Sequence, residues 1–217
     1  MVVLYTNNNG EFISLENLHI AEKELKDKNI YVNLTNKCPC SCTFCLRNTK
    51  EMSEANNLWL DREPTVQEII EEFEKYDITK FKEIVFCGFG EPLTRLDAIL
   101  EVAKYLKNRN SNIKVRINTN GLADLIHKKE TAPLYKGLID TISISLNASN
   151  AEEYFRLTRN KFGIESYDAM LKFAVSCKKY VPNVVMTVVD CIGQEEIDAC
   201  QAVCDNIGIP LRVRTFE

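Results

Sequence analysis

The chain has 217 residues, of which 45% are hydrophobic and 27% charged, and a formal net charge of −4. This length and balance fit one domain with a sizeable core, and the net charge gives no general attraction to nucleic acid or to an anionic membrane. The first ten residues, MVVLYTNNNG, soon become polar, and no apolar run approaches the ~20 residues that span a bilayer. We therefore expect no signal peptide and no membrane anchor, and a cytoplasmic location.

In chain order, β-rich runs alternate with helical patterns. Strands are predicted at residues 30–35, 83–87, 113–119, 140–147, 183–190 and 210–216. Helices are predicted at residues 65–76, 96–109, 122–136 (weakly), 167–180 and 195–208, the last ending at a Gly208 cap. Six strands alternating with helices indicate an α/β fold with a parallel sheet and right-handed crossovers. Residues 1–29 form a short N-terminal extension without an interpretation.

The strands alternate between polar and apolar residues, whereas a flat parallel sheet covered by helices on both faces reads as continuous apolar runs. In the strand at 140–147, for example, Thr141, Ser143 and Ser145 oppose Ile142 and Ile144. A curved sheet explains this pattern, because its apolar face meets outer helices and its polar face lines a lumen. Six strands then suggest an open, partial TIM-like barrel, (βα)6, that holds a polar ligand. Solvated edge strands are the alternative for one or two of the runs.

Nine cysteines are a high count for this length. Disulfides are rare in a reducing compartment, so clustered thiols favour metal binding or redox chemistry. The densest cluster, NKCPCSCTFCLRN at residues 36–48, leaves three interpretations: a disulfide knot, a zinc site and an iron–sulfur cluster. The disulfide knot is the weakest of these.

Cys38, Cys42 and Cys45 have the spacing C-x3-C-x2-C. Structural zinc prefers four ligands in two separated pairs, and no second Cys or His pair stands at a typical spacing, since His19 and His127 are isolated. Three thiolates can instead bind three irons of a [4Fe–4S] cube and leave the fourth iron open to a ligand that is not protein.

The stretch CPCSCTFC resembles the signature of radical SAM enzymes. The resemblance implies that the fourth iron chelates the amino and carboxylate groups of S-adenosylmethionine (SAM), and that Phe44 lies near the adenine. Cys40 is an extra thiol inside the loop. It can be a fourth ligand, as in fully ligated clusters, but a non-ligating role is favoured because three thiolates already explain the site.

A second motif, FCGFGEPL at residues 86–93, follows the second predicted strand. It resembles the G-G-E turn of the same family, whose backbone reaches the methionyl amino group of SAM. The residues that match it are Gly88, Phe89, Gly90 and Glu91, and Phe89 stands where the family commonly has another glycine. Glycine allows close approach of backbone to a ligand, and the ends of parallel strands are where α/β folds bind ligands.

Weaker matches lie at the ends of later strands. NTNG at residues 118–121, beginning with Asn118, resembles the T-N-G turn of many members, and ISLNAS at 144–149 resembles the S-L-D segment of the molybdopterin-precursor cyclase branch. Asn147 stands in place of the branch's Asp. Ser145 or Asn147 can bond the ribose or carboxylate of SAM, and Thr187 lies where relatives place a polar SAM contact. An ordinary polar strand residue is an equal interpretation for each.

Other residues carry less specific signals. Arg95, Arg212 and Arg214 are candidates for reading a carboxylate or phosphate of the substrate, with plain surface charge as the alternative. Cys191, Cys200 and Cys204 can be considered for a second cluster, but core packing is favoured for buried thiols, as for Cys87 and Cys177.

The resemblance covers residues 30–217, which we take as a radical SAM core domain. It implies that the reduced cluster passes one electron to SAM, whose C5′–S bond breaks to give methionine and a 5′-deoxyadenosyl radical that removes hydrogen from a substrate. A flavodoxin- or ferredoxin-type reductant is the implied partner.

Within the superfamily, YVNLTNKCPCSCTFCLRN and LWLDREPT look most like TatD-linked radical SAM proteins, which are associated with TatD-type hydrolases. The alternatives are an activase of a glycyl-radical enzyme and an enzyme that modifies RNA or a cofactor. A non-catalytic iron–sulfur redox sensor, or a zinc protein, is the rival from another class. The substrate, the fate of SAM and the oligomeric state are left open by the sequence.

Overall fold

The computed structural model describes residues 1–49, 53 and 57–215, and within this part of the chain two compact units are found. The first unit comprises Met1–Lys37 and Lys50–Ile117, and the second comprises Cys38–Thr49 and Asn118–Glu217. The boundary falls between Lys37 and Cys38, so the cysteine loop is grouped with the carboxy-terminal half of the chain rather than with the strand that precedes it.

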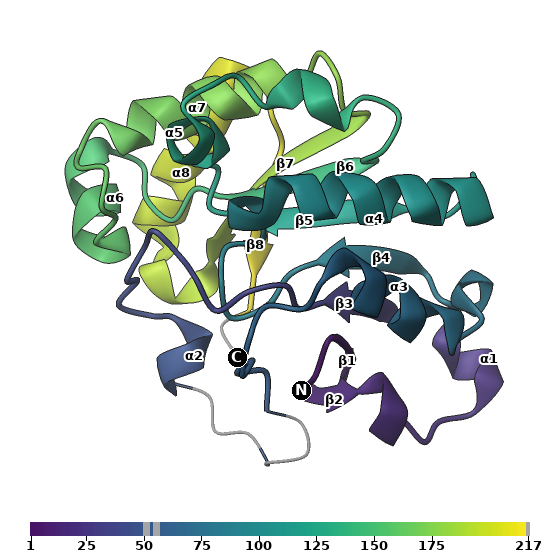
Figure 1. Cartoon of the computed structure of the whole chain (residues 1–217). Coiled ribbons are helices and arrows are strands. Elements are labelled where there is room, and N and C mark those ends of the chain that lie inside the picture. Colours follow the sequence, from purple (N-terminus) through teal and green to yellow (C-terminus); the bar gives the residue numbers. More distant parts are fainter. Residues whose placement is uncertain (50–52, 54–56, 216–217) are drawn as a thin grey trace. The chain divides into compact units, whose positions relative to one another are not determined.

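The first unit holds strands β1–β4, residues 115–117 of strand β5 and helices α1, α3 and α4 (Figure 1), and the last two residues of β5 belong to the second unit. The strands are β1 (Leu4–Asn8), β2 (Glu11–Ser14), β3 (Asn29–Val32), β4 (Glu83–Phe86) and β5 (Val115–Thr119). The helices are α1 (Glu22–Leu25), α3 (Val66–Glu74) and α4 (Leu96–Arg109). The strand order is β2-β1-β3-β4-β5, with β1 antiparallel to both neighbours and β3, β4 and β5 parallel.

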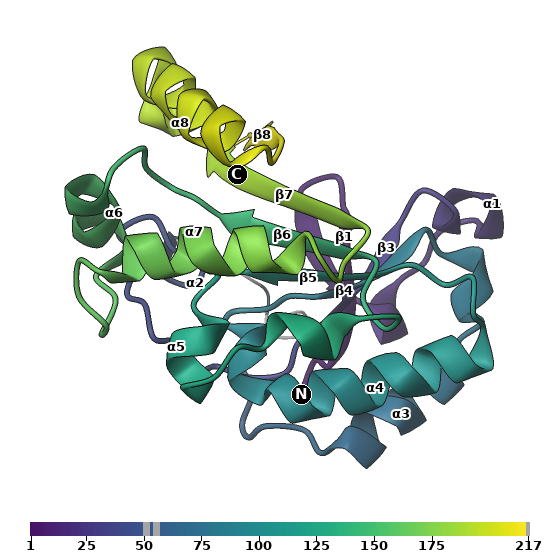
Figure 2. The ribbon, with the colours of Figure 1, turned by 90° about the horizontal axis from the view of Figure 1, so that it is seen from above.

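The core of the first unit lies on one face of these parallel strands. Its side chains alternate along each strand and have no exposed surface; they include Ile30, Val32, Ile84, Phe86, Val115 and Ile117. Helices α3 and α4 lie side by side against that face (Figure 2). The opposite face is mixed. Tyr31 and the fully buried Val85 lie in register with Arg116, which forms an ion pair of 3.1 Å with Glu83 on β4. The expected separation of an apolar from a polar face is therefore seen on β5, whereas β4 is apolar on both faces.

Helix α3 shows how the sequence sets an element's start. The side chain of Thr65 accepts a hydrogen bond from the Glu68 backbone, and the Glu68 carboxylate accepts one from the Thr65 backbone. This capping box satisfies two amide groups that a helix start otherwise leaves unpaired. The apolar stripe that follows buries Ile69 and Phe73.

The second unit holds helices α2 and α5–α8 and strands β6–β8. Its helices are α2 (Leu46–Thr49), α5 (Ala123–His127), α6 (Ala151–Thr158), α7 (Ser166–Cys177) and α8 (Gln194–Ile207). Its strands are β6 (Thr141–Ser145), β7 (Asn183–Val189) and β8 (Leu211–Arg214), all parallel and in that order. Large side chains without exposed surface form its core: Tyr135, Ile142, Ile144, Tyr154, Phe173 and Met186.

All six predicted strands are present, and four of the five predicted helices are confirmed with ends shifted by at most three residues. The end of the predicted strand at 216 lies outside the described residues. Gly208 caps α8 with φ +62°, and the amide of Ile209 donates to Cys204, as the sequence predicted.

The predicted helix at 122–136 is only partly correct. Helix α5 ends at His127, and Lys128 takes a left-handed conformation with φ +54°. A 3₁₀ turn at Ala132–Tyr135 follows. The break is stabilised because Asp124 accepts hydrogen bonds from both the backbone and the hydroxyl of Thr131, each of 2.8 Å.

Besides the one-turn helices α1 and α2, two larger features of the described residues were not predicted from the sequence. The first is the hairpin β1–β2, which adds two antiparallel strands beside β3 from within the uninterpreted residues 1–29. The second is α6, which begins at an Asn150 cap and ends at Arg159 with φ +46°. No helix among the described residues has the length and apolar character needed to cross a membrane.

Candidate functional site

The cysteine loop is held in the second unit by the carboxy-terminal end of α6. The amide of Ser41 donates to Thr158, and the amide of Thr43 donates to Leu157, at 2.9 and 3.0 Å. The amide of Lys161 in turn donates a hydrogen bond of 3.0 Å to the carbonyl of Pro39. Two backbone hydrogen bonds to the end of α6, which the sequence did not reveal, and one to the chain just after it therefore fix the middle of the loop.

None of the four cysteines of this loop forms a disulfide. Cys38, Cys42 and Cys45 are half-buried, whereas Cys40 is only 5% exposed. Phe44, the residue before the third cysteine, is also half-buried. The loop thus presents three accessible thiols and one enclosed thiol.

The cysteines influence one another's ionisation. A hydrogen bond from Cys40 lowers the pKa of Cys38 to about 6 against the opposing effect of burial, and the charge of Arg47 acts in the same direction. A hydrogen bond from Cys40 also lowers the pKa of Cys42. The pKa of Cys40 is raised, because its thiol is within hydrogen-bonding reach of both Cys38 and Cys42, and burial raises the pKa of Cys45. Cys40 therefore lies between two thiols that favour the thiolate form.

Asn120, in the predicted NTNG turn, contacts this arrangement from the residues that follow β5. Its side-chain amide lies 3.5 Å from the Cys40 sulfur. Among the described residues, no three His, Cys, Asp or Glu side chains are gathered around a position for a metal ion. The structure thus brings Cys38, Cys40 and Cys42 into contact without arranging them around one ion.

The glycine turn after β4 belongs to the first unit and meets the chain just before the cysteine loop. A Cβ atom on Gly90 would lie 2.3 Å from the carbonyl oxygen of Thr35 and 2.7 Å from that of Lys37. A Cβ atom on Gly88 would lie 2.2 Å from Oδ1 of Asn33. Both glycines are therefore required by close approach of the chain to itself.

Phe89 and Glu91 complete this turn with buried side chains. Phe89 is 8% exposed and packs edge-on against Trp59, with ring centres 5.2 Å apart. The Glu91 carboxylate accepts a 3.0 Å hydrogen bond from the Leu93 amide, and the Glu91 amide donates 2.9 Å to the carbonyl of Lys37. The side chains of this turn thus serve the protein's own packing, and its backbone is the part left for a ligand.

The weaker candidates all lie in the second unit. Asn118, at the end of β5, has a buried Oδ1 atom without a hydrogen-bond partner among the described residues. Ser145 and Thr187 are register partners on β6 and β7, and the Thr187 hydroxyl donates 3.3 Å to the carbonyl of Ile144. Asn147 is buried in the left-handed region with φ +66°. Asn118 thus has free hydrogen-bonding capacity, whereas Asn147 has a conformational reason for its identity.

The arginines have different environments. Arg95 donates 3.2 and 3.0 Å to the carbonyls of Leu34 and Pro64, so its guanidinium is engaged within the protein and a substrate role for it is not supported. Arg212 reaches from β8 to the hydroxyl of Ser143 at 3.0 Å. Arg214 is exposed.

In the part of the chain that the structure describes, the remaining cysteines are not gathered with other ligating side chains around a position for a metal ion. Cys177, Cys200 and Cys204 have no exposed surface, and burial raises the pKa of Cys200 to about 12 and of Cys204 to about 11. Cys191 is exposed. Core packing describes these three buried thiols, as expected, whereas Cys87, which was also expected in the core, is half-buried.

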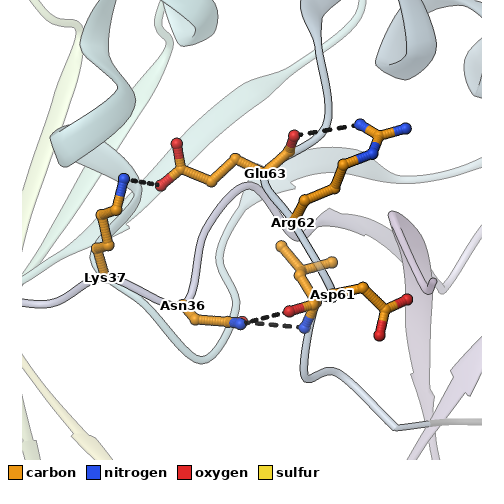
Figure 3. A pocket seen from close by; sticks show the side chains of 6 residues that line it. Asn36, Lys37, Asp61, Arg62 and Glu63 are labelled. Atoms are coloured by element: carbon orange, nitrogen blue, oxygen red, sulfur yellow. Dashed lines mark hydrogen bonds and ion pairs between the residues drawn. The ribbon is translucent and has the colours of Figure 1, made fainter.

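Sequence reasoning missed a polar cluster beside the glycine turn. A hollow of about 320 Å³ lies there, lined by Asn36, Lys37, Leu60, Asp61, Arg62 and Glu63 (Figure 3). Its two cations already face carboxylates, because Lys37 pairs with Glu63 at 3.1 Å and Arg62 bonds Glu68 at 2.8 Å. The motif LWLDREPT, which the sequence singled out only for its resemblance, supplies most of this lining.

Comparison with known proteins identifies the family. The model of the Radical SAM superfamily matches residues 32–202. A probable GTP 3′,8-cyclase of Thermococcus kodakarensis is 28% identical over 171 residues, which cover 78% of this chain and 50% of that protein. The dual-specificity RNA methyltransferase RlmN of Nautilia profundicola is 26% identical over 211 residues, covering 93% and 57%. The chain thus spans about half the length of the curated relatives it matches.

Solved structures share the fold at low identity. The crystal structure of Streptococcus suis SuiB bound to S-adenosylmethionine aligns with a TM-score of 0.59 at 17% identity, covering 86% of this chain and 40% of that one. A radical SAM methyltransferase from Sphaerobacter thermophilus aligns with a TM-score of 0.57 at 16% identity, covering 94% and 72%. At these identities the likeness concerns the fold alone.

Proposed function

This chain belongs to the radical SAM superfamily, and from that premise we propose that it binds a [4Fe–4S] cluster through Cys38, Cys42 and Cys45 and reductively cleaves SAM. The single observation that carries the proposal is the C-x3-C-x2-C loop inside the matched residues 32–202. The prediction of the superfamily, of its α/β fold with an open parallel sheet, and of the cluster and SAM as the family's cofactors is confirmed.

The residues present fit this group by their chemistry. Iron–sulfur clusters are held by thiolates, and Cys38, Cys42 and Cys45 take part in no disulfide and lie half-buried on one short loop. Asn118 supplies a buried oxygen without a partner among the described residues, as a polar ligand requires. When bound, the cluster supplies one electron to SAM, which releases methionine and a 5′-deoxyadenosyl radical.

The protein's own part is to hold and orient SAM. We assign the methionyl amino group to the backbone of Gly88, Phe89, Gly90 and Glu91, since their side chains are absent or turned into the protein. Phe44 is assigned to the adenine. Asn118, Ser145, Asn147 and Thr187 are the remaining candidates for the ribose and carboxylate.

The substrate is proposed at the level of a class. Relatives named as GTP 3′,8-cyclase and RNA methyltransferase favour modification of a nucleotide-derived cofactor or of RNA. The TatD-linked subfamily remains a proposal based on the residues of LWLDREPT and the cysteine loop. The glycyl-radical activase remains a further alternative. The partner is a flavodoxin- or ferredoxin-type reductant in the cytoplasm, with a TatD-type hydrolase as a candidate neighbour.

Anaerobic reconstitution followed by addition of SAM and dithionite tests the proposal. We expect about four irons per chain and release of 5′-deoxyadenosine. Cys42→Ala should lose both the brown chromophore and the cleavage, whereas the matched control Cys40→Ala should keep both. A redox sensor would form the cluster without releasing 5′-deoxyadenosine, and loss of the cluster in Cys40→Ala would show that the ligands are assigned wrongly.

A further inference from the structure

Residues 34–37 form the last stretch of chain before Cys38. They run between two segments of the first unit: the glycine turn at 88–91 and residues 57–65, which we call the strap. On the side of the turn, the carbonyl of Lys37 accepts a hydrogen bond from the Glu91 amide at 2.9 Å. Gly90 fits only because it has no side chain. One side of this stretch is therefore fixed by backbone contacts alone.

The strap holds the other side through side chains. Asn36 forms a two-point contact with Leu60, donating 2.7 Å to its carbonyl and accepting 3.1 Å from its amide. This pairing reproduces the hydrogen bonds of a strand partner with one amide side chain. It sets the register between the strap and the residues that precede the cysteine loop.

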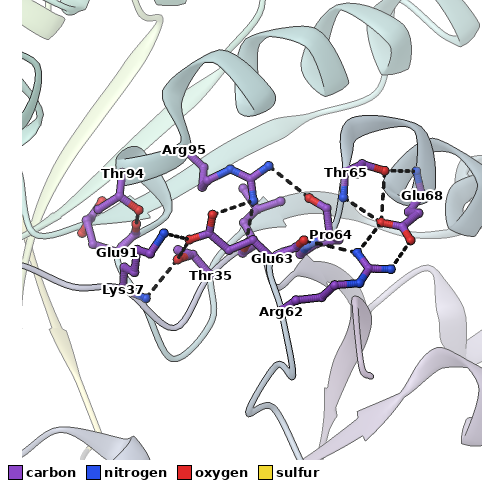
Figure 4. Close-up of polar contacts among 11 residues, drawn as sticks. Thr35, Lys37, Arg62, Glu63, Pro64, Thr65, Glu68, Glu91, Thr94 and Arg95 are labelled. Carbon is purple, nitrogen blue, oxygen red and sulfur yellow. Dashed lines mark hydrogen bonds and ion pairs between the residues drawn. The ribbon is translucent and has the colours of Figure 1, made fainter.

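Glu63 is the centre of the second contact between the strap and this stretch (Figure 4). Its Oε1 atom accepts a hydrogen bond of 2.8 Å from the Thr35 hydroxyl and lies 3.1 Å from Nζ of Lys37. Its Oε2 atom lies 3.5 Å from the guanidinium of Arg95, which also donates to Leu34. The Glu63 carboxylate thus contacts Thr35 and Lys37, which belong to residues 34–37, and Arg95, which binds them.

The Thr35 hydroxyl extends this arrangement toward Cys38. It donates to Glu63 and accepts a 2.9 Å hydrogen bond from the amide of Lys37. The Lys37 amide is therefore held by a chain of hydrogen bonds that ends on the Glu63 carboxylate. Since Cα atoms of neighbouring residues are about 3.8 Å apart across a rigid peptide, fixing Lys37 restricts the position of Cys38.

We propose that Glu63 is a positioning residue for the first cluster thiol: through Thr35 and Lys37 it fixes the chain that delivers Cys38 to iron. This inference rests on the proposed function, because it gives Cys38 the role of a ligand. Glu63 itself contacts neither the cluster nor SAM. A rigid backbone around a ligating thiol slows its departure from iron, so the expected property is retention of the cluster.

Three variants test the proposal. Glu63→Gln keeps an acceptor for Thr35 and loses the charge that faces Lys37 and Arg95, and Glu63→Ala loses all three contacts. Glu68→Gln is the matched control, because Glu68 is the carboxylate of an exposed ion pair with Arg62 and takes no part in holding residues 34–37. A glutamine at this position also preserves the capping box of α3.

The first readout is the rate at which a strong iron chelator removes iron from the reconstituted protein. Loss of a charge-assisted hydrogen bond is expected to accelerate release by about tenfold in Glu63→Ala, with Glu63→Gln between it and wild type and Glu68→Gln at the wild-type rate. Thr35→Val removes the hydroxyl that links the Lys37 amide to Glu63 and should also accelerate release. Combined with Glu63→Ala it should not multiply the two effects, because both of these changes break the Thr35–Glu63 hydrogen bond.

The second readout is amide hydrogen exchange in the protein without its cluster. Glu63→Gln should accelerate exchange of residues 34–38 and leave the peptide covering β6 unchanged. Equal iron-release rates in wild type and both Glu63 variants, or acceleration of exchange in both peptides alike, would assign Glu63 to general stability and overturn the proposal. A wild-type protein that forms no cluster would overturn the proposed function as well, so the two failures are distinguishable.

Discussion

Gly90 gives the sharpest test of how the glycine turn is built. In Gly90→Ala the new methyl group would lie 2.3 Å from the carbonyl oxygen of Thr35 and 2.7 Å from that of Lys37, both closer than the 3.0 Å that real Cβ contacts respect. Neither oxygen can easily withdraw, because the Lys37 carbonyl accepts from Glu91 and the adjacent stretch is pinned to the strap. Overpacking costs about 1–3 kcal/mol, and two backbone atoms place this case near the upper end.

Thermal unfolding followed by circular dichroism measures the effect. For a chain of this size 1 kcal/mol corresponds to about 2–4 °C, so the melting temperature should fall by about 6–12 °C. Gly137→Ala is the control, because nothing lies within 4 Å of its Cβ position and only its φ of +76° opposes a side chain. A side chain in that backbone conformation lowers the free energy of unfolding by about 1–2 kcal/mol. A Gly90→Ala protein that melts no lower than Gly137→Ala would refute the reasoning.

Two further predictions concern Asn147 and Glu63. Asn147→Ala should lower the free energy of unfolding, measured by urea denaturation, by about 1 kcal/mol because residue 147 has a left-handed φ, whereas Asn147→Gly should leave it unchanged. Equal losses of stability in the two variants would show that the contacts of the Asn147 side chain, not its backbone conformation, are responsible. Burial opposes ionisation of Glu63, but the Thr35 hydroxyl, Lys37 and Arg95 outweigh it, so its pKa lies below the ordinary 4.5. The stability it adds is present above 4.5 and lost as pH falls through the lowered pKa, so the difference between wild type and Glu63→Gln should shrink in acid; a difference that stays constant would contradict this.

The sheet could be predicted because apolar and polar residues alternate along several of its strands. On β5 the alternate positions Val115 and Ile117 are fully buried while Arg116 and Asn118 are half-buried, and this pattern needs no knowledge of distant contacts. The hairpin β1–β2 was missed although its signal was present. Asn9 and Gly10 both have positive φ and join Asn8 to its register partner Glu11, which is the two-residue Asn-Gly turn that favours a hairpin.

The candidate site was predictable only where its residues are close in sequence. The spacing of Cys38, Cys42 and Cys45 indicates binding of an iron–sulfur cluster from a segment of only eight residues. The contact between Thr35 and Glu63 joins residues 28 positions apart and follows no periodicity. Asn120 lies 80 positions from Cys40. Such pairs are created by tertiary packing, so a single sequence carries no local sign of them.

Phe89 connects the sequence pattern of the turn with its physical construction. The residue replaces a glycine that is common in the family, which made the match look imperfect. Its side chain is buried with Val2, Tyr5 and Leu58 in one apolar cluster. The two flanking glycines, by contrast, sit where any Cβ would collide with the protein. A side chain is therefore tolerated at the one position that points into the core and forbidden at the two that meet the chain, which explains why Gly-Phe-Gly can build this turn.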